Sequence, residues 1–139
     1  IDRFLRDNDR GSISALMIAG VWIEGQYLAT QVALSHTDEI LRDRDGEQKI
    51  ILGDLLMLLR PYRQSSEEYK SLYEMMEGIS TEYTDVKVSY RLGEPETIED
   101  KGRLVMVQHE ESIVEMSDEQ LAKIAEMSKE VRNKLISGQ

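Results

Sequence analysis

The most apolar stretch of the chain runs over Ile13–Leu34, and Glu24 is its only charged residue. At 100° per residue, the alanines of this stretch share one face of a helix, and aliphatic side chains cover both flanks. A helix that is apolar almost all the way round is typical of the middle of a helical domain. The pattern therefore predicts a buried central helix, with Ser12 as its N-cap and an end near Ser35.

The same stretch is long enough to span a membrane, since about 20 apolar residues suffice. Glu24 lies near its centre, however, with Gln26 and Gln31 close by. A carboxylate at that depth costs about 2.5–3.5 kcal/mol on insertion scales. No basic cluster flanks the stretch on one side. We therefore expect a helix of a soluble bundle and no transmembrane span.

A second main helix is predicted over Lys49–Leu59 from the spacing of its leucines and isoleucines. Before it, residues 38–42 indicate a short turn, and Asp45-Gly46 indicates a further turn or a kink. Pro61 follows the helix and ends it or bends it sharply. At the other end of the chain, apolar spacing over 1–8 predicts the tail of a helix that begins upstream.

The third and last helices are marked by their N-terminal caps. Ser65 or Ser66 begins the third, whose apolar seam over 69–90 repeats with spacings of three and four residues. The last follows Ser117-Asp118-Glu119-Gln120, which has the form of a capping box, and ends near Ser137-Gly138. Both patterns predict helices with one apolar face.

Residues 93–116 differ from the rest in being acidic and in alternating polar with β-branched residues. Glu96–Gly102 is expected to be a mobile acidic segment. Leu104–Val107 and Ser112–Met116 are predicted to pair as a small hairpin, with its turn at 108–111. Because an isolated hairpin is only marginally stable, it must lie on the bundle or on another part of the protein.

These elements predict a mainly α fold. We expect an antiparallel bundle of about four helices around the buried central helix, with a small peripheral β-hairpin. A length of 139 residues fits one helical-bundle domain over 1–139, into which 93–116 is inserted as an acidic segment and hairpin.

The net charge of −10 argues against nucleic acid as a partner. Seventeen basic residues are scattered among 27 acidic ones, whereas a phosphate-binding surface needs clustered Lys and Arg. No cysteine is present, so disulfides and thiolate sites are excluded, and the compartment stays open. Because the chain begins at Ile1, we expect it to be the C-terminal part of a longer protein.

Few residues suggest chemistry. Glu24 is a carboxylate on the most apolar helix, where burial raises the pKa of a carboxyl and suits it to acid–base work or metal binding. It shares a side with Gln31, which indicates a narrow polar stripe reaching solvent. His36 and His109 are the only imidazoles, lack the spacing of metal ligands and are expected to be exposed. The sequence therefore predicts no catalytic residue, no metal and no cofactor.

A ligand site is the other possibility that the aromatic residues raise. A small hydrophobic ligand between helices would lie near four residues that combine aromatic rings with one carboxylate, namely Trp22, Glu24, Tyr27 and Tyr83.

The chain resembles uncharacterised helical lipoproteins of Bacteroidetes in four segments. These are the sequence ISALMIAGVWIEGQYLATQVA, a long Tyr- and Leu-containing helix after Pro61, an acidic segment, and the sequence SDEQLAKIAEMSKEVRNKLI. The resemblance covers most of the chain. It implies a bundle of the cell envelope or periplasm, with an upstream half and an N-terminal lipid anchor. It implies no catalytic residues, and the residues themselves also leave a cytoplasmic location open.

We therefore expect a non-catalytic structural or interaction module of the cell envelope. Its partner would be the upstream half of the same chain or another envelope protein, and an exposed flank of the first main helix would need such cover. The alternatives are a module that binds a small hydrophobic ligand and an enzyme using Glu24, which would need a second titratable group within reach.

Overall fold

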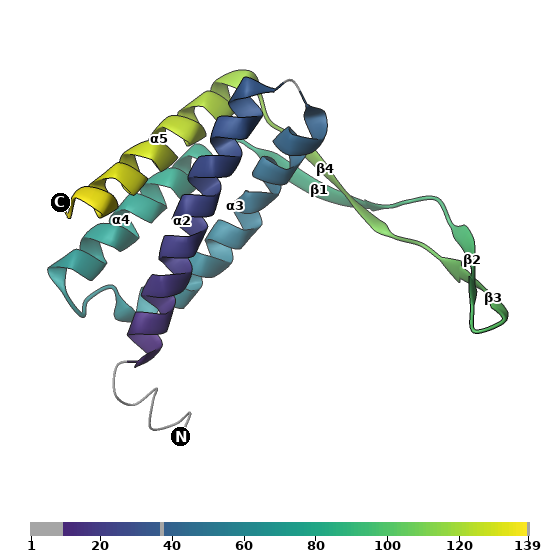
Figure 1. Cartoon of the computed structure of the whole chain (residues 1–139), viewed down its shortest axis with the longest axis horizontal. Coiled ribbons are helices and arrows are strands. Elements are labelled where there is room, and N and C mark those ends of the chain that lie inside the picture. The colour runs from purple at the N-terminus through teal and green to yellow at the C-terminus, as the bar shows by residue number, and fades with distance from the viewer. Residues whose placement is uncertain (1–9, 37, 139) are drawn as a thin grey trace.

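Four helices lie side by side and run alternately up and down in the computed structural model, which describes residues 10–36 and 38–138 (Figure 1). Helix α2 contacts α3 and α5, and α4 contacts the same two helices. The helices are α2 (Gly11–Ser35), α3 (Glu39–Leu59), α4 (Glu67–Glu82) and α5 (Asp118–Ser137), with a short 3-10 helix η2 (Arg60–Tyr62) between α3 and α4. The predicted mainly α fold is confirmed. The helix tail predicted over 1–8 lies outside the described residues.

Side-chain caps set three of the helix starts. The Asp38 carboxylate accepts from the Ile40 backbone N–H, and the Ser66 hydroxyl accepts from that of Tyr69. Ser117 and Gln120 form the predicted capping box at the start of α5. Each contact satisfies an N–H group that the helix itself leaves unpaired. The predicted N-cap of α2, Ser12, is wrong, because Arg10 occupies the N-cap position.

The expectation of a central helix buried on all sides is not confirmed. Helix α2 is one of four helices in a ring, and only one of its faces points to the core, with Ala15, Ala19 and Ile23 buried. On the opposite side Met17 is 67% exposed and Val21 is 74% exposed. An apolar helix surface can thus be left uncovered when the rest of the domain supplies too few elements to enclose it.

The turn or kink predicted at Asp45-Gly46 is wrong, because α3 is continuous through both residues. A Cβ atom at Gly46 would overlap the side chain of Val114, which belongs to strand β4 (Glu110–Glu115). The glycine therefore serves close packing between a helix and a strand instead of chain reversal.

The third helix ends earlier than its apolar seam predicted. Helix α4 stops at Glu82, and strand β1 (Lys87–Leu92) takes up the residues expected to continue it. Tyr83 and Val86 are both buried, so the apolar positions are used, but in a turn and at a strand start. β-branched residues around Val86 and Val88 favour the strand.

The predicted hairpin also has the wrong partners. β1 pairs with β4, and β2 (Glu96–Asp100) pairs with β3 (Arg103–Val107), both antiparallel. The turn lies at Lys101-Gly102, which have φ angles of 51° and 77°, and not at 108–111. Two successive positive φ angles are typical of the tight turn of a two-residue hairpin. The segment expected to be mobile is therefore strand β2 and this turn.

Together the four strands form one long two-stranded ribbon with a bend in its middle (Figure 1). At the bend, three residues of one side, 93–95, face two residues of the other, 108–109. The Gly93 N–H donates to the His109 carbonyl at 2.7 Å, after which Pro95 has no N–H to offer. An extra residue on one strand is a β-bulge, which bends and twists the ribbon.

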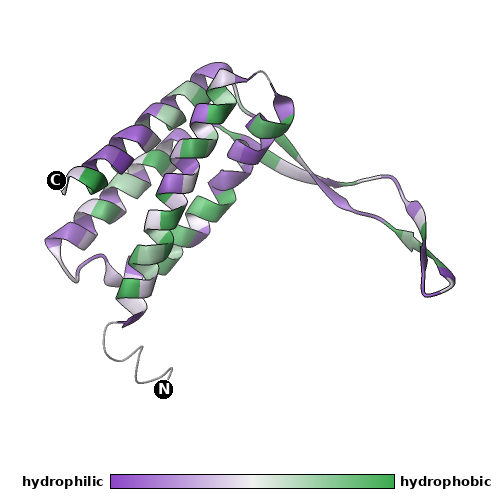
Figure 2. Ribbon diagram, viewed as in Figure 1, coloured by the Kyte–Doolittle hydropathy of each residue, from purple (hydrophilic) through white to green (hydrophobic). Residues whose placement is uncertain are grey.

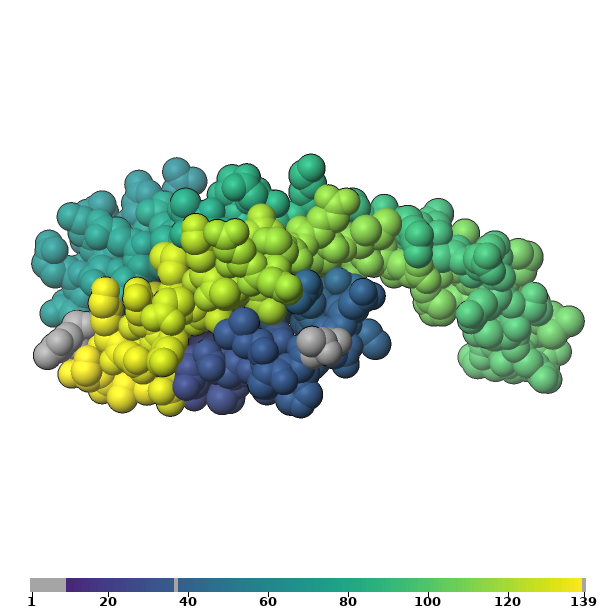
Figure 3. Space-filling model, turned by 90° about the horizontal axis from the view of Figure 1, so that it is seen from above, coloured from purple at the N-terminus to yellow at the C-terminus, as the bar shows by residue number. Residues whose placement is uncertain are grey.

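The root of the ribbon is fixed to α3. Val114 packs against Gly46, the Ser112 hydroxyl bonds the Glu47 carboxylate, and Lys49 Nζ donates to the Val86 carbonyl at 2.7 Å. Beyond this root the ribbon extends clear of the helices, as the view from above shows (Figure 3). The bundle thus carries a projecting arm that has no core of its own.

The core lies between the four helices and contains mainly aliphatic side chains, with Tyr69, Tyr73 and Tyr83 from α4 and its C-terminal end. None of the helices in the described part of the chain has the length and apolar content that crossing a membrane requires.

Candidate functional site

The four residues predicted to surround a ligand do not converge on one cavity. Trp22 is partly buried at the side of α2 next to α3, and its Nε1–H donates to Gln48 Oε1 at 2.9 Å. Glu24 and Tyr27 lie on the other side of α2, next to α5. None of the pockets described below is lined by Trp22, Glu24, Tyr27 or Tyr83.

Glu24 has a structural partner in Arg132 of α5. Arg132 Nε donates to Glu24 Oε2 at 2.8 Å, and the guanidinium lies 4.5 Å from the centre of the Tyr27 ring. The carboxylate is half-exposed, so the predicted polar stripe reaching solvent is observed. One arginine thus joins a carboxylate and an aromatic ring across the α2–α5 contact, which stabilises this helix pair.

Tyr83 belongs to a buried polar cluster between α2, α3 and the end of α4. Its hydroxyl accepts from Gln26 Nε2 at 2.5 Å and donates to the Asp45 carbonyl at 3.1 Å. Gln26, Asp45 and Tyr83 are all almost completely inaccessible to solvent. The cluster connects the middle of α2 to α3 by hydrogen bonds. The adjacent Gly46 packs against Val114 of the ribbon.

Two atoms of this cluster have no hydrogen-bond partner among the described residues, Gln26 Oε1 and Asp45 Oδ2. Burial raises the pKa of Asp45 from its usual 3.8 to about 6, because a charge at this position loses its hydration. Burial also raises the pKa of Tyr83. Sequence reasoning missed Asp45, because an Asp-Gly pair is usually a turn signal.

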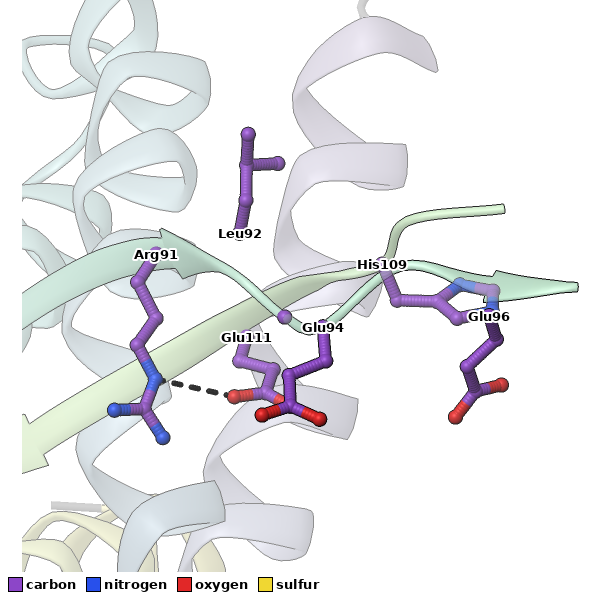
Figure 4. Close-up of a pocket in the computed structure, with 7 residues that line it drawn as sticks. Arg91, Leu92, Glu94, Glu96, His109 and Glu111 are labelled. Atoms are coloured by element: carbon purple, nitrogen blue, oxygen red, sulfur yellow. Dashed lines mark hydrogen bonds and ion pairs between the residues drawn. The ribbon is translucent and has the colours of Figure 1, made fainter. Parts of the chain in front are cut away.

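A polar hollow lies at the bend of the ribbon and measures about 530 Å³. Figure 4 shows Arg91 turned toward Glu111, whose Oε2 accepts from Arg91 Nε at 3.1 Å. Glu94 lies beside this pair, with Glu96 and His109 further along the ribbon. Within residues 10–36 and 38–138, no three His, Asp or Glu side chains are placed to hold a metal ion. Both His109 and His36 are exposed, as predicted.

A second hollow, of about 370 Å³, lies between the start of α4 and the end of α5 and includes Glu67, Met75 and Leu135 in its lining. Two others, of about 480 and 300 Å³, lie where the root of the ribbon meets α3.

An exposed apolar surface lies on the outside of α2. We call it the α2 stripe, and its side chains are 45–74% exposed, namely Met17, Ile18, Val21, Leu28 and Val32. Ile51 and Leu58 of α3 are also 46% and 43% exposed, and Ile51 lines the hollow at the root of the ribbon. Figure 2 shows hydrophobic residues recurring along both helices.

The distal ribbon also exposes apolar side chains. Leu104 is 80% exposed and Met106 is 72% exposed, both on β3. Sequence reasoning located an exposed flank on the first main helix, but it did not locate the arm, because the pairing of β2 with β3 was missed. A comparison with known proteins finds no protein family, no curated protein and no solved structure that matches this chain.

Proposed function

We propose that this chain is a non-catalytic interaction module that contributes to an assembly of the cell envelope. The observation that carries the proposal is the α2 stripe. Scattered apolar side chains are ordinary on a protein surface, but a continuous patch along a whole helix marks a site of protein contact.

The charge distribution supports the same function. Glu24 is the only charged residue of α2, and it is bonded to Arg132, so the stripe is uncharged in a chain of net charge −10. The core of a protein interface is depleted of charged residues in the same way. In the described part of the chain, most other acidic residues lie on the ribbon and at exposed positions of the other helices.

The envelope location rests on the resemblance to helical lipoproteins of Bacteroidetes, which implies a lipid anchor upstream. It is tested by expressing the full-length gene with a tag after Gly138 and separating membrane, periplasmic and cytoplasmic fractions. Recovery in the envelope, lost when the cysteine of a lipobox is replaced, is the expected result. Recovery in the cytoplasm contradicts the location and leaves the interaction function to be tested separately.

The alternative function, binding of a small hydrophobic ligand between helices, has less support. Trp22 and Tyr83 are held by hydrogen bonds to Gln48, Gln26 and the Asp45 backbone. The space around them is filled by core side chains, whereas a ligand site requires a continuous hollow.

The interaction function is tested by photo-crosslinking in the source cells. A photoreactive residue at position 21 or 28 places the probe on the α2 stripe, and the matched control at position 126 or 129 places it on the exposed face of α5. We expect a crosslinked protein, of any identity, from the stripe positions and none from the controls. Equal labelling at both faces, or none at either, contradicts the proposal.

A further inference from the structure

We propose that the partner of the α2 stripe is a second copy of this chain, bound across a two-fold axis that passes close to Gly25. This inference rests on the proposed function and adds the identity of the partner. It predicts an antiparallel pair of α2 helices at the centre of a homodimer.

The positions of the exposed side chains support self-pairing. Val21 and Leu28 lie four residues before and three residues after Gly25, and Met17 and Val32 lie eight before and seven after. At 100° per residue all four fall within a sector of about 60°. These four positions therefore read the same in either direction, whereas Ile18, the fifth residue of the stripe, has Gln31 at the mirrored position.

A two-fold axis uses this symmetry directly. In an interface of this kind each patch meets a copy of itself, so the contacts occur in reciprocal pairs. An axis perpendicular to α2 near Gly25 places Val21 opposite Leu28 of the partner and Met17 opposite Val32 of the partner. Unlike a foreign partner, a second copy carries the matching spacing by construction.

Gly25 permits close approach at the crossing point. It is exposed, and a Cβ atom built at this position meets nothing within 4 Å. Glu24, the other residue beside the axis, is bonded to Arg132 of α5. This bond draws the Glu24 carboxylate toward α5, so the two helix backbones can approach at Gly25 until the flanking aliphatic side chains interlock.

Charge makes the stripe the region of the surface best suited to self-association. In a symmetric dimer a surface patch contacts the same patch of the partner, so two acidic patches would repel each other. In a chain of net charge −10 the α2 stripe has no unpaired charge, whereas the distal ribbon carries Glu96, Glu99 and Asp100.

The exposed area agrees with a dimer. A fully exposed aliphatic side chain contributes about 100 Å², so the stripe with Ile51 and Leu58 exposes about 400 Å² of apolar surface. A standard interface buries about 800 Å² per partner, of which somewhat more than half is apolar. The stripe therefore supplies apolar area of the size that one side of a standard interface needs.

Sedimentation equilibrium of the 139-residue chain and two matched variants tests the dimer. Val21→Glu places a charge on the stripe, and Leu104→Glu makes the same change at an equally exposed position on the ribbon. We expect a concentration-dependent dimer, a dissociation constant at least tenfold higher for Val21→Glu, and no change for Leu104→Glu. Circular dichroism confirms that the variants are folded.

A monomeric wild-type chain at about 100 µM overturns the homodimer. So does a dimer that Leu104→Glu dissociates and Val21→Glu leaves intact. If the wild-type chain is monomeric while crosslinking at position 21 captures another protein, the interaction function stands and only the second copy is wrong. If the chain is monomeric and crosslinking at position 21 captures no protein, both the homodimer and the interaction function are wrong.

The arrangement is tested by disulfide formation, which the absence of native cysteines makes clean. We expect an equimolar mixture of Val21→Cys and Leu28→Cys chains to give a crosslinked heterodimer on mild oxidation. Each variant alone should remain uncrosslinked, because two copies of position 21 lie about 10 Å apart along the antiparallel pair. Efficient crosslinking of Val21→Cys alone indicates parallel helices and overturns the proposed axis.

Discussion

At the scale of single residues, Asp45 is the most unusual position of the chain. Its carboxyl group is buried, and Oδ2 has no partner within the described residues. A buried carboxylate without a counter-charge destabilises the folded state, and protonation removes that cost.

Replacing Asp45 with Asn should therefore stabilise the protein at neutral pH. The pKa of Asp45 is about 6 in the folded protein, against its usual 3.8. Between these two pH values the folded state therefore binds more protons than the unfolded state. Stability of the wild type should fall as pH rises from about 4 to about 6 and stay level above. Asp45→Asn should abolish this fall and gain about 1–3 kcal/mol at pH 8.

Urea unfolding at pH 5 and pH 8 measures both effects, with Asp54→Asn, an exposed carboxylate of the same helix, as the control. An Asp45→Asn variant that is less stable than the wild type at pH 8 would show that the carboxylate makes a favourable contact.

At the scale of elements, two glycines of α3 differ in their surroundings, and only one of them meets the ribbon. A Cβ atom at Gly46 overlaps Val114 of β4, whereas a Cβ atom at Gly53, seven residues later in the same helix, meets nothing within 4 Å. Both residues have helical backbones, so their intrinsic cost in the helix is the same.

Gly46→Ala should destabilise the protein by about 1–3 kcal/mol, because the β4 strand must move away from α3. Gly53→Ala should instead stabilise it by about 0.5–1 kcal/mol through helix propensity alone. Thermal or urea denaturation of the two variants measures whether each change lowers or raises the stability of the protein. Two gains of equal size would mean that Val114 does not pack against α3 in solution.

The strands and the end of α4 show why the β region was predicted incorrectly. The alternation in 104–107 and 112–116 identified strands, but alternation does not state which strand pairs with which. Lys101 at a positive φ is an uncommon turn residue, so the true turn carried a weak signal beside Gly102. The early end of α4 was likewise hidden, because Tyr83 and Val86 continue the apolar spacing of the helix although the chain has left it.

At the scale of the whole molecule, the bundle and the distal ribbon are nearly independent. β1 and β4 contact α3, whereas the main contacts of β2 and β3 are with each other. The arm therefore adds reach to the molecule and little to the stability of the helices.

Shortening the arm should leave the bundle intact. Gly93 and His109 face each other across the ribbon, so residues 94–108 can be replaced by an Asn-Gly turn. We expect an unfolding free energy within about 0.5 kcal/mol of the wild type, and a helical circular dichroism signal that is retained. A much larger loss would indicate that the distal ribbon folds against the helices in solution.

The positions of most helices and the capping box at Ser117 followed from the sequence alone, because apolar spacing and caps are local properties of the chain. The exposed side of α2 did not, because a helix that is apolar all round shows no preferred face, and only its neighbours decide which face is covered. The roles of Asp45 and Gly46 were also decided by tertiary structure, since burial and the approach of Val114 come from segments distant in sequence. Local signals determine which elements form, whereas long-range packing determines which surfaces those elements leave free.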